Sequence, residues 1–138
     1  MKKERPRVKD YNEAHAKSGL TVKLPAVETF PNQYPGYTIK IEIPEYTAVC
    51  PKTGLPDFGT IILEYEPVKD VLELKSLKGY ILAYRNIGIF YENAVNRMLR
   101  DFTAAARPKW CRVTGVFATR GGMHSTITAQ SGKVPPRD

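Results

Sequence analysis

A turn rich in proline and glycine, at residues 50–57, separates two runs with the composition of β-strands. Before the turn, residues 37–43 alternate apolar and polar side chains, and an apolar, β-branched run continues to Val49; after it, residues 58–65 are again largely apolar. Alternation with a period of two is typical of a half-buried strand. Proline fixes its own φ angle and glycine tolerates angles that other residues avoid. The pattern predicts a long β-hairpin with a stiff tip.

Cys50 and Asp57 stand at the two ends of this turn. Because each adjoins a strand-like run, we expect their side chains near the same end of a sheet, where they could converge on one small molecule. A single cysteine is also commonly a small buried hydrophobic residue, and an aspartate after a proline is commonly a turn former. The residue types alone leave both interpretations open.

Two stretches with helical periodicity follow the hairpin. Apolar residues recur at helical spacing within residues 74–85 and again within residues 91–106, where the pattern stops before Pro108. Strand-like runs return at residues 110–120 and 124–128. The order ββααββ predicts an α+β fold, an antiparallel four-stranded sheet with both helices on one face.

The chain of 138 residues has the size of one domain. Residues 1–36 are polar, then punctuated by proline, and we expect a flexible basic arm followed by an extended lead-in. Residues 37–130 carry the periodic pattern of the folded domain, and residues 131–138 form a polar tail that we expect to be disordered. One domain is small for a self-contained active site with a bulky cofactor, so we expect the chain to oligomerise.

The composition, 42% hydrophobic and 25% charged, is that of a soluble globular protein, and no run approaches the ~20 apolar residues that cross a bilayer. The basic N-terminus lacks the apolar segment of a signal peptide, so we expect a cytoplasmic protein without a membrane partner. The net charge of +7 and the pI near 9.5 suit nucleic acid or an anionic ligand such as a phosphate-bearing cofactor.

Metal ligands are scarce. A zinc site needs three or four cysteine, histidine or carboxylate ligands, and the cysteines and histidines of this chain are only Cys50, Cys111, His15 and His124. We therefore expect no metal site. The same two cysteines, without an export signal, argue against a disulfide framework.

Three further groups of charged residues have both a functional and an ordinary interpretation. Lys75 and Lys78 lie on one side of a predicted helix start, where they would form either a phosphate site or a solvated basic face. Arg120 precedes two glycines, so it could either contact a phosphate or belong to an exposed turn. Glu92, in the first turn of the second helix, either stabilises the helix dipole or accepts hydrogen bonds from a guanine-like edge.

Five short motifs occur in a specific order and spacing. They are Cys-Pro-Lys-Thr-Gly-x-Pro-Asp-Phe at 50–58, Glu-Leu-Lys-Ser-x-Lys at 73–78, Tyr-Arg-Asn at 84–86, Phe-Tyr-Glu at 90–92 and Arg-Gly-Gly at 120–122. Over roughly residues 37–130 the chain resembles the short, single-module NADPH-dependent 7-cyano-7-deazaguanine reductases, the nitrile reductases of queuosine biosynthesis. The motif at 73–78 separates these reductases from zinc-dependent GTP cyclohydrolases and an archaeal amidinotransferase of the same tunnelling fold.

The resemblance implies a tunnelling fold assembled into a homo-oligomer of stacked rings, with active sites between subunits. It implies NADPH-dependent reduction of a nitrile to an amine through a cysteine thioimide, in the synthesis of a modified tRNA nucleoside but without direct contact to nucleic acid. The implied catalytic residues are Cys50 as nucleophile and Asp57 as proton donor. The implied substrate-binding residues are Leu72, Glu73, Leu74, Tyr91 and Glu92. The implied NADPH-binding residues are Lys75, Ser76, Lys78 and Arg120.

The chain departs from the family pattern at two positions: some members have histidine where this chain has Tyr91, and Gly79 stands where they usually carry a larger residue. Two alternatives stay beside this hypothesis. One is a relative of the same fold that acts on a pterin or deazapurine without reduction, in the manner of a cyclohydrolase or an amidinotransferase. The other is a basic RNA-binding module, whose affinity would fall steeply with salt.

Overall fold

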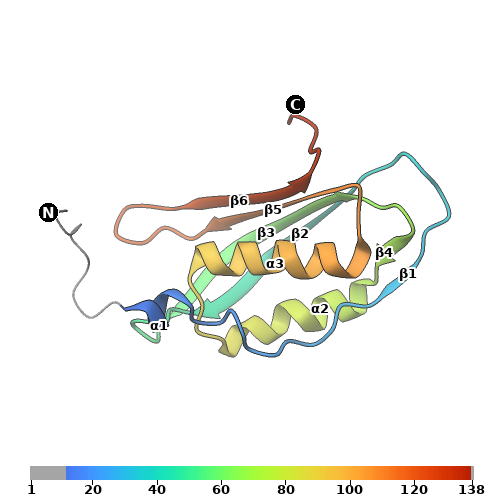
Figure 1. The fold of residues 1–138 in the computed structure, drawn as a ribbon. Coiled ribbons are helices and arrows are strands. Elements are labelled where there is room, and N and C mark those ends of the chain that lie inside the picture. The colour runs from blue at the N-terminus through green and yellow to red at the C-terminus, as the bar shows by residue number, and fades with distance from the viewer. Residues whose placement is uncertain (1–11, 138) are drawn as a thin grey trace, which may run out of the picture.

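The computed structural model describes residues 12–137 of the chain. Its centre is a four-stranded antiparallel sheet in the order β2-β3-β5-β6, with two helices on one face (Figure 1). The elements of this layer are β2 (Ile39–Val49), β3 (Pro56–Glu66), α2 (Leu74–Leu82), α3 (Tyr91–Ala106), β5 (Trp110–Phe117) and β6 (Thr126–Gly132). The predicted α+β class and the order ββααββ are confirmed.

β2 and β3 form the predicted hairpin, with Ala48 opposite Asp57 at its tip. The pairing register shifts between Ile43 and Tyr46, which marks an irregularity of the β-bulge type. One extra residue reverses which side chains face the helices. The inward face therefore changes from Ile41 and Ile43 to Tyr46 and Ala48, both of which are buried.

α3 has the predicted bounds, and its apolar stripe contributes buried residues such as Val95, Met98 and Phe102 to the core. α2 is shorter than the predicted helix at 74–85, because the chain tightens into the 3-10 helix η1 (Ala83–Asn86). Within η1, Tyr84 is fully buried, and its ring packs against the ring of Tyr46 at 5.7 Å between centroids.

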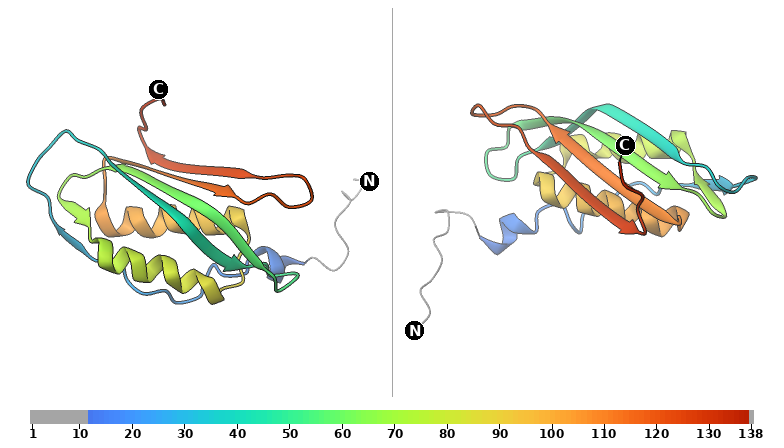
Figure 2. Two further views of the ribbon diagram at one scale, coloured as in Figure 1. Left: turned by 180° about the vertical axis from the view of Figure 1, so that it is seen from behind. Right: turned by 90° about the horizontal axis from the view of Figure 1, so that it is seen from above.

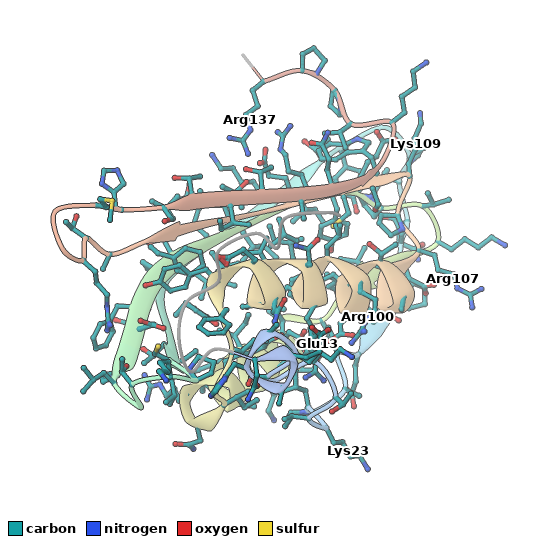
Figure 3. The ribbon with its side chains drawn as sticks, turned by 60° about the vertical axis from the view of Figure 1, so that its left-hand side comes forward. Glu13, Lys23, Arg100, Arg107, Lys109 and Arg137 are labelled. Atoms are coloured by element: carbon teal, nitrogen blue, oxygen red, sulfur yellow. The ribbon has the colours of Figure 1, made fainter. Side chains whose placement is uncertain are left out.

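The last two strands differ from their predicted bounds. β5 ends at Phe117, three residues early, and β6 runs beyond the predicted residue 128 to Gly132. The intervening loop turns at Gly121 and Gly122, both with positive φ. The face of the sheet opposite the helices is visible in Figure 2, and the C-terminal segment crosses it. There Arg137 donates to Thr114 Oγ1 on β5 (Figure 3), although the sequence predicts a disordered tail.

Residues 12–36 precede the sheet, and residues 17–28 run along the helices (Figure 1). The segment 12–36 contains α1 (Glu13–Ala16) and β1 (Thr29–Pro31), which pairs with β4 (Asp70–Leu72). The buried Arg97 of α3 donates to the carbonyl oxygens of Gly19 and Val22 and so ties this segment to the domain. The N-terminal part of the predicted basic arm, residues 1–11, lies outside the described residues, and the division into arm, domain and tail stays a prediction. No helix in residues 12–137 is long and apolar enough to cross a membrane.

Candidate active site

The tip of the β2–β3 hairpin positions Cys50. The Cys50 N–H donates to the Leu55 carbonyl at 2.9 Å, and the Gly54 N–H donates to the Cys50 carbonyl at 2.9 Å. Gly54 has a φ angle of 71°, which a side chain would disfavour. The turn is therefore closed on both sides of the cysteine, and the thiol is only partly buried.

A short parallel bridge brings the start of α3 to the hairpin tip. The Val49 N–H donates to the Ile87 carbonyl, and the Ile89 N–H donates to the Val49 carbonyl, each at 3.0 Å. Because Tyr91 is the first residue of α3, this bridge fixes the helix start beside the cysteine that follows Val49. Sequence periodicity does not predict such a bridge, since it joins isolated residues far apart in the chain.

Asp57 is the centre of the polar contacts at this end. The residue is 5% exposed, and its Oδ1 accepts a hydrogen bond from the Tyr91 hydroxyl at 3.3 Å. The same oxygen lies 3.2 Å from Arg120 Nη2. Arg120 also donates to the Pro56 carbonyl, so the loop between β5 and β6 closes over the hairpin tip. The prediction that Cys50 and Asp57 share one end of the sheet is confirmed by their places in β2–β3, and Tyr91 and Arg120 join them.

The ring of Tyr91 is held flat against Phe117 of β5, with centroids 3.8 Å apart and planes within 5°. Burial, followed by the negative charge of Asp57 and the hydrogen bond to it, raises the pKa of the Tyr91 hydroxyl. Tyr91 is therefore a neutral hydrogen-bond donor at physiological pH. The stack fixes the direction in which this hydroxyl points.

The two cysteines have opposite chemical character. Burial raises the pKa of the Cys50 thiol, but hydrogen bonds from the Thr53 side chain and from the Thr53 and Lys52 backbone outweigh it, so the pKa is lowered overall. Burial raises the pKa of Cys111 to about 12, only partly offset by a hydrogen bond from Thr103. Since the thiolate is the nucleophilic form, the two pKa shifts favour Cys50 over Cys111 as a nucleophile, and the buried Cys111 packs in β5.

The predicted substrate-binding residues at 72–74 lie at the opposite end of the subunit, where β4 leads into α2 (Figure 1). Leu72 is buried, and its N–H donates to the Tyr65 hydroxyl at 3.0 Å. Leu74 is 63% exposed. Within one copy, this segment and the hairpin tip are separated by the length of β3, 11 residues or roughly 35 Å.

Glu73 caps the start of α2. Its carboxylate accepts hydrogen bonds from the backbone N–H of Lys75 at 2.9 Å and of Ser76 at 2.6 Å, which lower its pKa. The Ser76 hydroxyl donates to the Glu73 carbonyl and accepts from the Glu28 N–H. Lys75 and Lys78 are exposed. An anion at this helix start would therefore meet lysine ammonium groups, because Glu73 occupies the N–H groups.

Glu92 is exposed in the first turn of α3, at the same end as Cys50. Among residues 12–137, no cluster of three or more histidine, cysteine, aspartate or glutamate side chains could hold a metal ion. The hairpin end of the molecule thus combines a partly exposed thiol of lowered pKa, a buried carboxylate, a tyrosine hydroxyl and an exposed carboxylate. This combination suits covalent and proton-transfer chemistry.

The model of the QueF-like protein family matches residues 56–136. The chain belongs to this family. An NADPH-dependent 7-cyano-7-deazaguanine reductase of Elusimicrobium minutum is 52% identical over 121 residues, which cover 87% of this chain and 92% of that protein. A reductase of the same name from Chloroherpeton thalassium is 54% identical over 110 residues, which cover 78% of this chain and 95% of that protein.

A solved structure has the same fold. It is the apo form of the archaeosine synthase QueF-Like, which is 25% identical and superposes with a TM-score of 0.68 over 74% of this chain and 100% of that chain. The family resemblance and the tunnelling fold predicted from the sequence motifs are confirmed. For this family member, the roles assigned to individual residues stay predictions.

Proposed function

We propose that this chain uses NADPH to reduce the nitrile of 7-cyano-7-deazaguanine to the aminomethyl group of 7-aminomethyl-7-deazaguanine, in queuosine synthesis in the cytoplasm. The observation that carries the proposal is the shared site at the hairpin end, where Asp57 contacts both Tyr91 and Arg120 and adjoins the turn that holds Cys50. Relatives 52% and 54% identical over most of their own lengths bear the name of this activity.

Covalent addition explains why the site contains a cysteine. A nitrile carbon is a poor hydride acceptor, and addition of a thiolate converts it into a thioimide that accepts hydride more readily. The Cys50 sulfur forms a bond to the nitrile carbon, one carbon–nitrogen π bond breaks, and the nitrogen takes a proton. Asp57 carries the proton lost by the thiol to that nitrogen, so the addition consumes no net proton.

Two molecules of NADPH, bound in turn, would supply the two hydrides that reduction of a nitrile to an amine requires. Lys75 and Lys78 would bind the phosphate groups of NADPH, since both ammonium groups are exposed near the start of α2. Arg120, whose side chain is 44% exposed, would be a third cation that contacts these phosphates. Ser76 belongs to the same group, although its hydroxyl is engaged with Glu73 and Glu28. After the first reduction Cys50 leaves as thiolate, and the site must exclude water because an imine hydrolyses.

Substrate recognition is proposed for both ends of the subunit. Glu92 would accept hydrogen bonds from the guanine-like edge of the deazaguanine, next to Tyr91. The segment 72–74 would line the same pocket, but from a second copy of the chain, because it lies about one strand length away within one copy. We therefore propose a homo-oligomer with active sites between subunits, assembled as stacked rings. The edge strands β2 and β6 of the sheet are available for such assembly.

The decisive test is an NADPH oxidation assay with the nitrile, followed by mass spectrometry of the product. The proposal predicts two NADPH oxidised for each nitrile consumed, with the primary amine as product and no loss of activity after treatment with a chelator. A cyclohydrolase-like or amidine-forming enzyme would consume no NADPH. An RNA-binding module would likewise leave NADPH unchanged and would bind RNA with a steep salt dependence.

A mixing experiment tests the shared site. Cys50→Ala disables the hairpin end and Lys75→Ala/Lys78→Ala weakens the α2 end, and each variant alone should have little activity. Co-refolded mixtures should regain up to about a quarter of wild-type activity, because random assembly gives some sites two intact halves. Mixtures that stay as inactive as the separate variants would contradict a site built from two copies.

A further inference from the structure

The chain that follows α1 lies at the hairpin end of the molecule, beside the start of α3 (Figure 1). Gly19 makes its closest approach. The φ angle of Gly19 is 81°, and a Cβ there would lie 2.6 Å from Ile89 Cβ and 2.9 Å from the Gly88 carbonyl oxygen. Any side chain would overlap these atoms, so the position requires glycine. The mechanism above assigns no role to this contact.

The peptide group that joins Gly88 to Ile89 connects this contact to the nucleophile. In a trans peptide the carbonyl and the N–H point in opposite directions. The carbonyl faces the N-terminal segment, and the Ile89 N–H donates to the carbonyl of Val49, which precedes Cys50, at 3.0 Å. A Cβ on Gly88 would lie 3.7 Å from the Cα of Pro51, which follows the cysteine. One peptide group thus lies between the N-terminal segment and the turn of the nucleophile.

The same segment is bound to the first two turns of α3. The Asn93 side chain donates to the Ala16 carbonyl at 2.6 Å. The buried Arg97 donates to the carbonyls of Gly19 and Val22. The segment therefore contacts both parts of the candidate site, the helix turn that carries the exposed carboxylate and the peptide beside the cysteine.

We infer that residues 16–22 form a brace for the active site, in which Gly19 is a positioning residue. Through the peptide group that it contacts, Gly19 sets the place of the Cys50 turn relative to the start of α3. The inference rests on the proposed function, because it takes Cys50 as the nucleophile and Glu92 as the residue that binds the ring. A misplacement of about 1 Å can lower a rate by about a hundredfold, so the brace contributes to turnover as well as to stability.

Gly19→Ala tests the inference, with Gly36→Ala as its matched control. Both glycines have a positive φ, 81° and 75°, so alanine strains the backbone at either position. At Gly36, however, a Cβ would meet no atom of residues 12–137 within 4 Å. Only Gly19→Ala should displace the peptide group beside the nucleophile, and the comparison separates this contact from backbone strain.

We expect Gly19→Ala to lower kcat for the nitrile by about tenfold to a hundredfold, because the nucleophile moves relative to the bound ring. The KM for the nitrile should stay within about threefold of wild type, since Glu92 keeps its place on α3. Gly36→Ala should stay within about twofold of wild type in both constants. A glycine that only stabilises the fold would lower the melting temperature and leave both constants of the folded enzyme unchanged.

Amide hydrogen exchange follows the brace without either substrate. In Gly19→Ala, the Val49 and Ile89 amides of the bridge should exchange about tenfold faster than in wild type, relative to the amides of β5. Gly36→Ala should leave this ratio unchanged. If circular dichroism shows that Gly19→Ala does not fold, Asn93→Ala, which removes the contact with Ala16, takes its place in both measurements. Its kcat should fall by about twofold to tenfold, the effect of one neutral hydrogen bond.

A wild-type kcat in Gly19→Ala, or an equal loss in Gly36→Ala, would overturn the inference. A lower kcat with unchanged exchange at the bridge amides would also overturn it, because the loss would not pass through the bridge. If the wild-type enzyme oxidises no NADPH with the nitrile, the proposed function fails, whereas faster exchange in Gly19→Ala would still support the contact between the brace and the turn of Cys50.

Discussion

Arg120 Nη2 lies 3.2 Å from Asp57 Oδ1, so the loop between β5 and β6 delivers a cation to the carboxylate at the hairpin tip. Asp57 is 5% exposed, and a buried carboxylate that loses a cationic partner is costly. The Tyr91 hydroxyl reaches the same oxygen from α3. Three segments that are distant in the sequence thus meet at one carboxylate.

Arg120→Ala should lower kcat/KM for the nitrile by about tenfold to a hundredfold, the effect of losing a hydrogen bond to a charged group. Arg120→Lys keeps the charge but cannot reach both Asp57 and the Pro56 carbonyl with one planar group, so it should recover only part of the activity. Steady-state kinetics with each substrate varied checks this prediction. Unchanged kinetics in Arg120→Ala would show that the ion pair has no part in turnover.

Tyr91→Phe removes the hydroxyl that donates to Asp57 but keeps the stack on Phe117. We expect kcat to fall by about tenfold to a hundredfold, because a hydrogen bond to a charged carboxylate contributes about 1.5–3 kcal/mol, and we expect a smaller loss of melting temperature than in Tyr91→Ala. Tyr91→Ala also loses the stack and should melt at a clearly lower temperature. Equal melting temperatures for the two variants would contradict the structural role of the ring.

Glu92→Ala should weaken binding of the nitrile by about tenfold or more, since it removes a charged acceptor for the ring edge. Glu92→Gln keeps the shape and one acceptor, and should bind more tightly than the alanine variant. Isothermal titration calorimetry without NADPH measures both. Because Glu92 is exposed, neither change should affect the fold, and tight binding by Glu92→Ala would remove this residue from substrate recognition.

Stability should depend on pH through Glu64, which accepts from Arg112 Nε at 3.1 Å and from Nη2 at 3.0 Å. The hydrogen bond from Arg112 is the main cause that lowers the pKa of Glu64. A carboxyl with a lowered pKa in the folded state adds stability above its unfolded pKa of about 4.3, and that stability is lost as the pH falls through the lowered value.

Glu64→Gln should therefore reduce the free energy of unfolding by about 1–3 kcal/mol at pH 7, and by less as the pH falls below about 4. Urea unfolding at fixed protein concentration measures the difference. Glu42→Gln is the control, because its pair with Lys40 is exposed on both sides and should contribute less than about 1 kcal/mol. If Glu64→Gln reduced the free energy of unfolding by the same amount at pH 7 and below about pH 4, the ionic contribution of Glu64 would be contradicted.

Local patterns in the sequence predict the elements well where one apolar stripe dominates. α3 has the predicted bounds because its apolar residues repeat without interruption until Pro108. α2 ends early, at Leu82, because the chain tightens into η1, where Tyr84 reaches the core. The register shift between Ile43 and Tyr46 is not predicted by an alternation with a period of two, because one inserted residue leaves the composition of the strand unchanged.

The site was predictable in part. Cys50 and Asp57 flank one turn, so their shared location follows from the hairpin alone. The contact between Arg120 and Asp57 joins residues 63 positions apart and depends on how a loop folds over the sheet, which no local pattern encodes. The Glu73 cap on α2 is a short-range feature, but its carboxylate could equally have pointed to a ligand.

The most direct test of the covalent mechanism is to mix the enzyme with 7-cyano-7-deazaguanine in the absence of NADPH, denature it and measure the intact mass. We predict an adduct equal to the mass of the nitrile, mapped by peptide analysis to Cys50, present in Cys111→Ser and absent in Cys50→Ser. No adduct on wild-type enzyme that turns over the nitrile, or an adduct that persists in Cys50→Ser, would contradict the account.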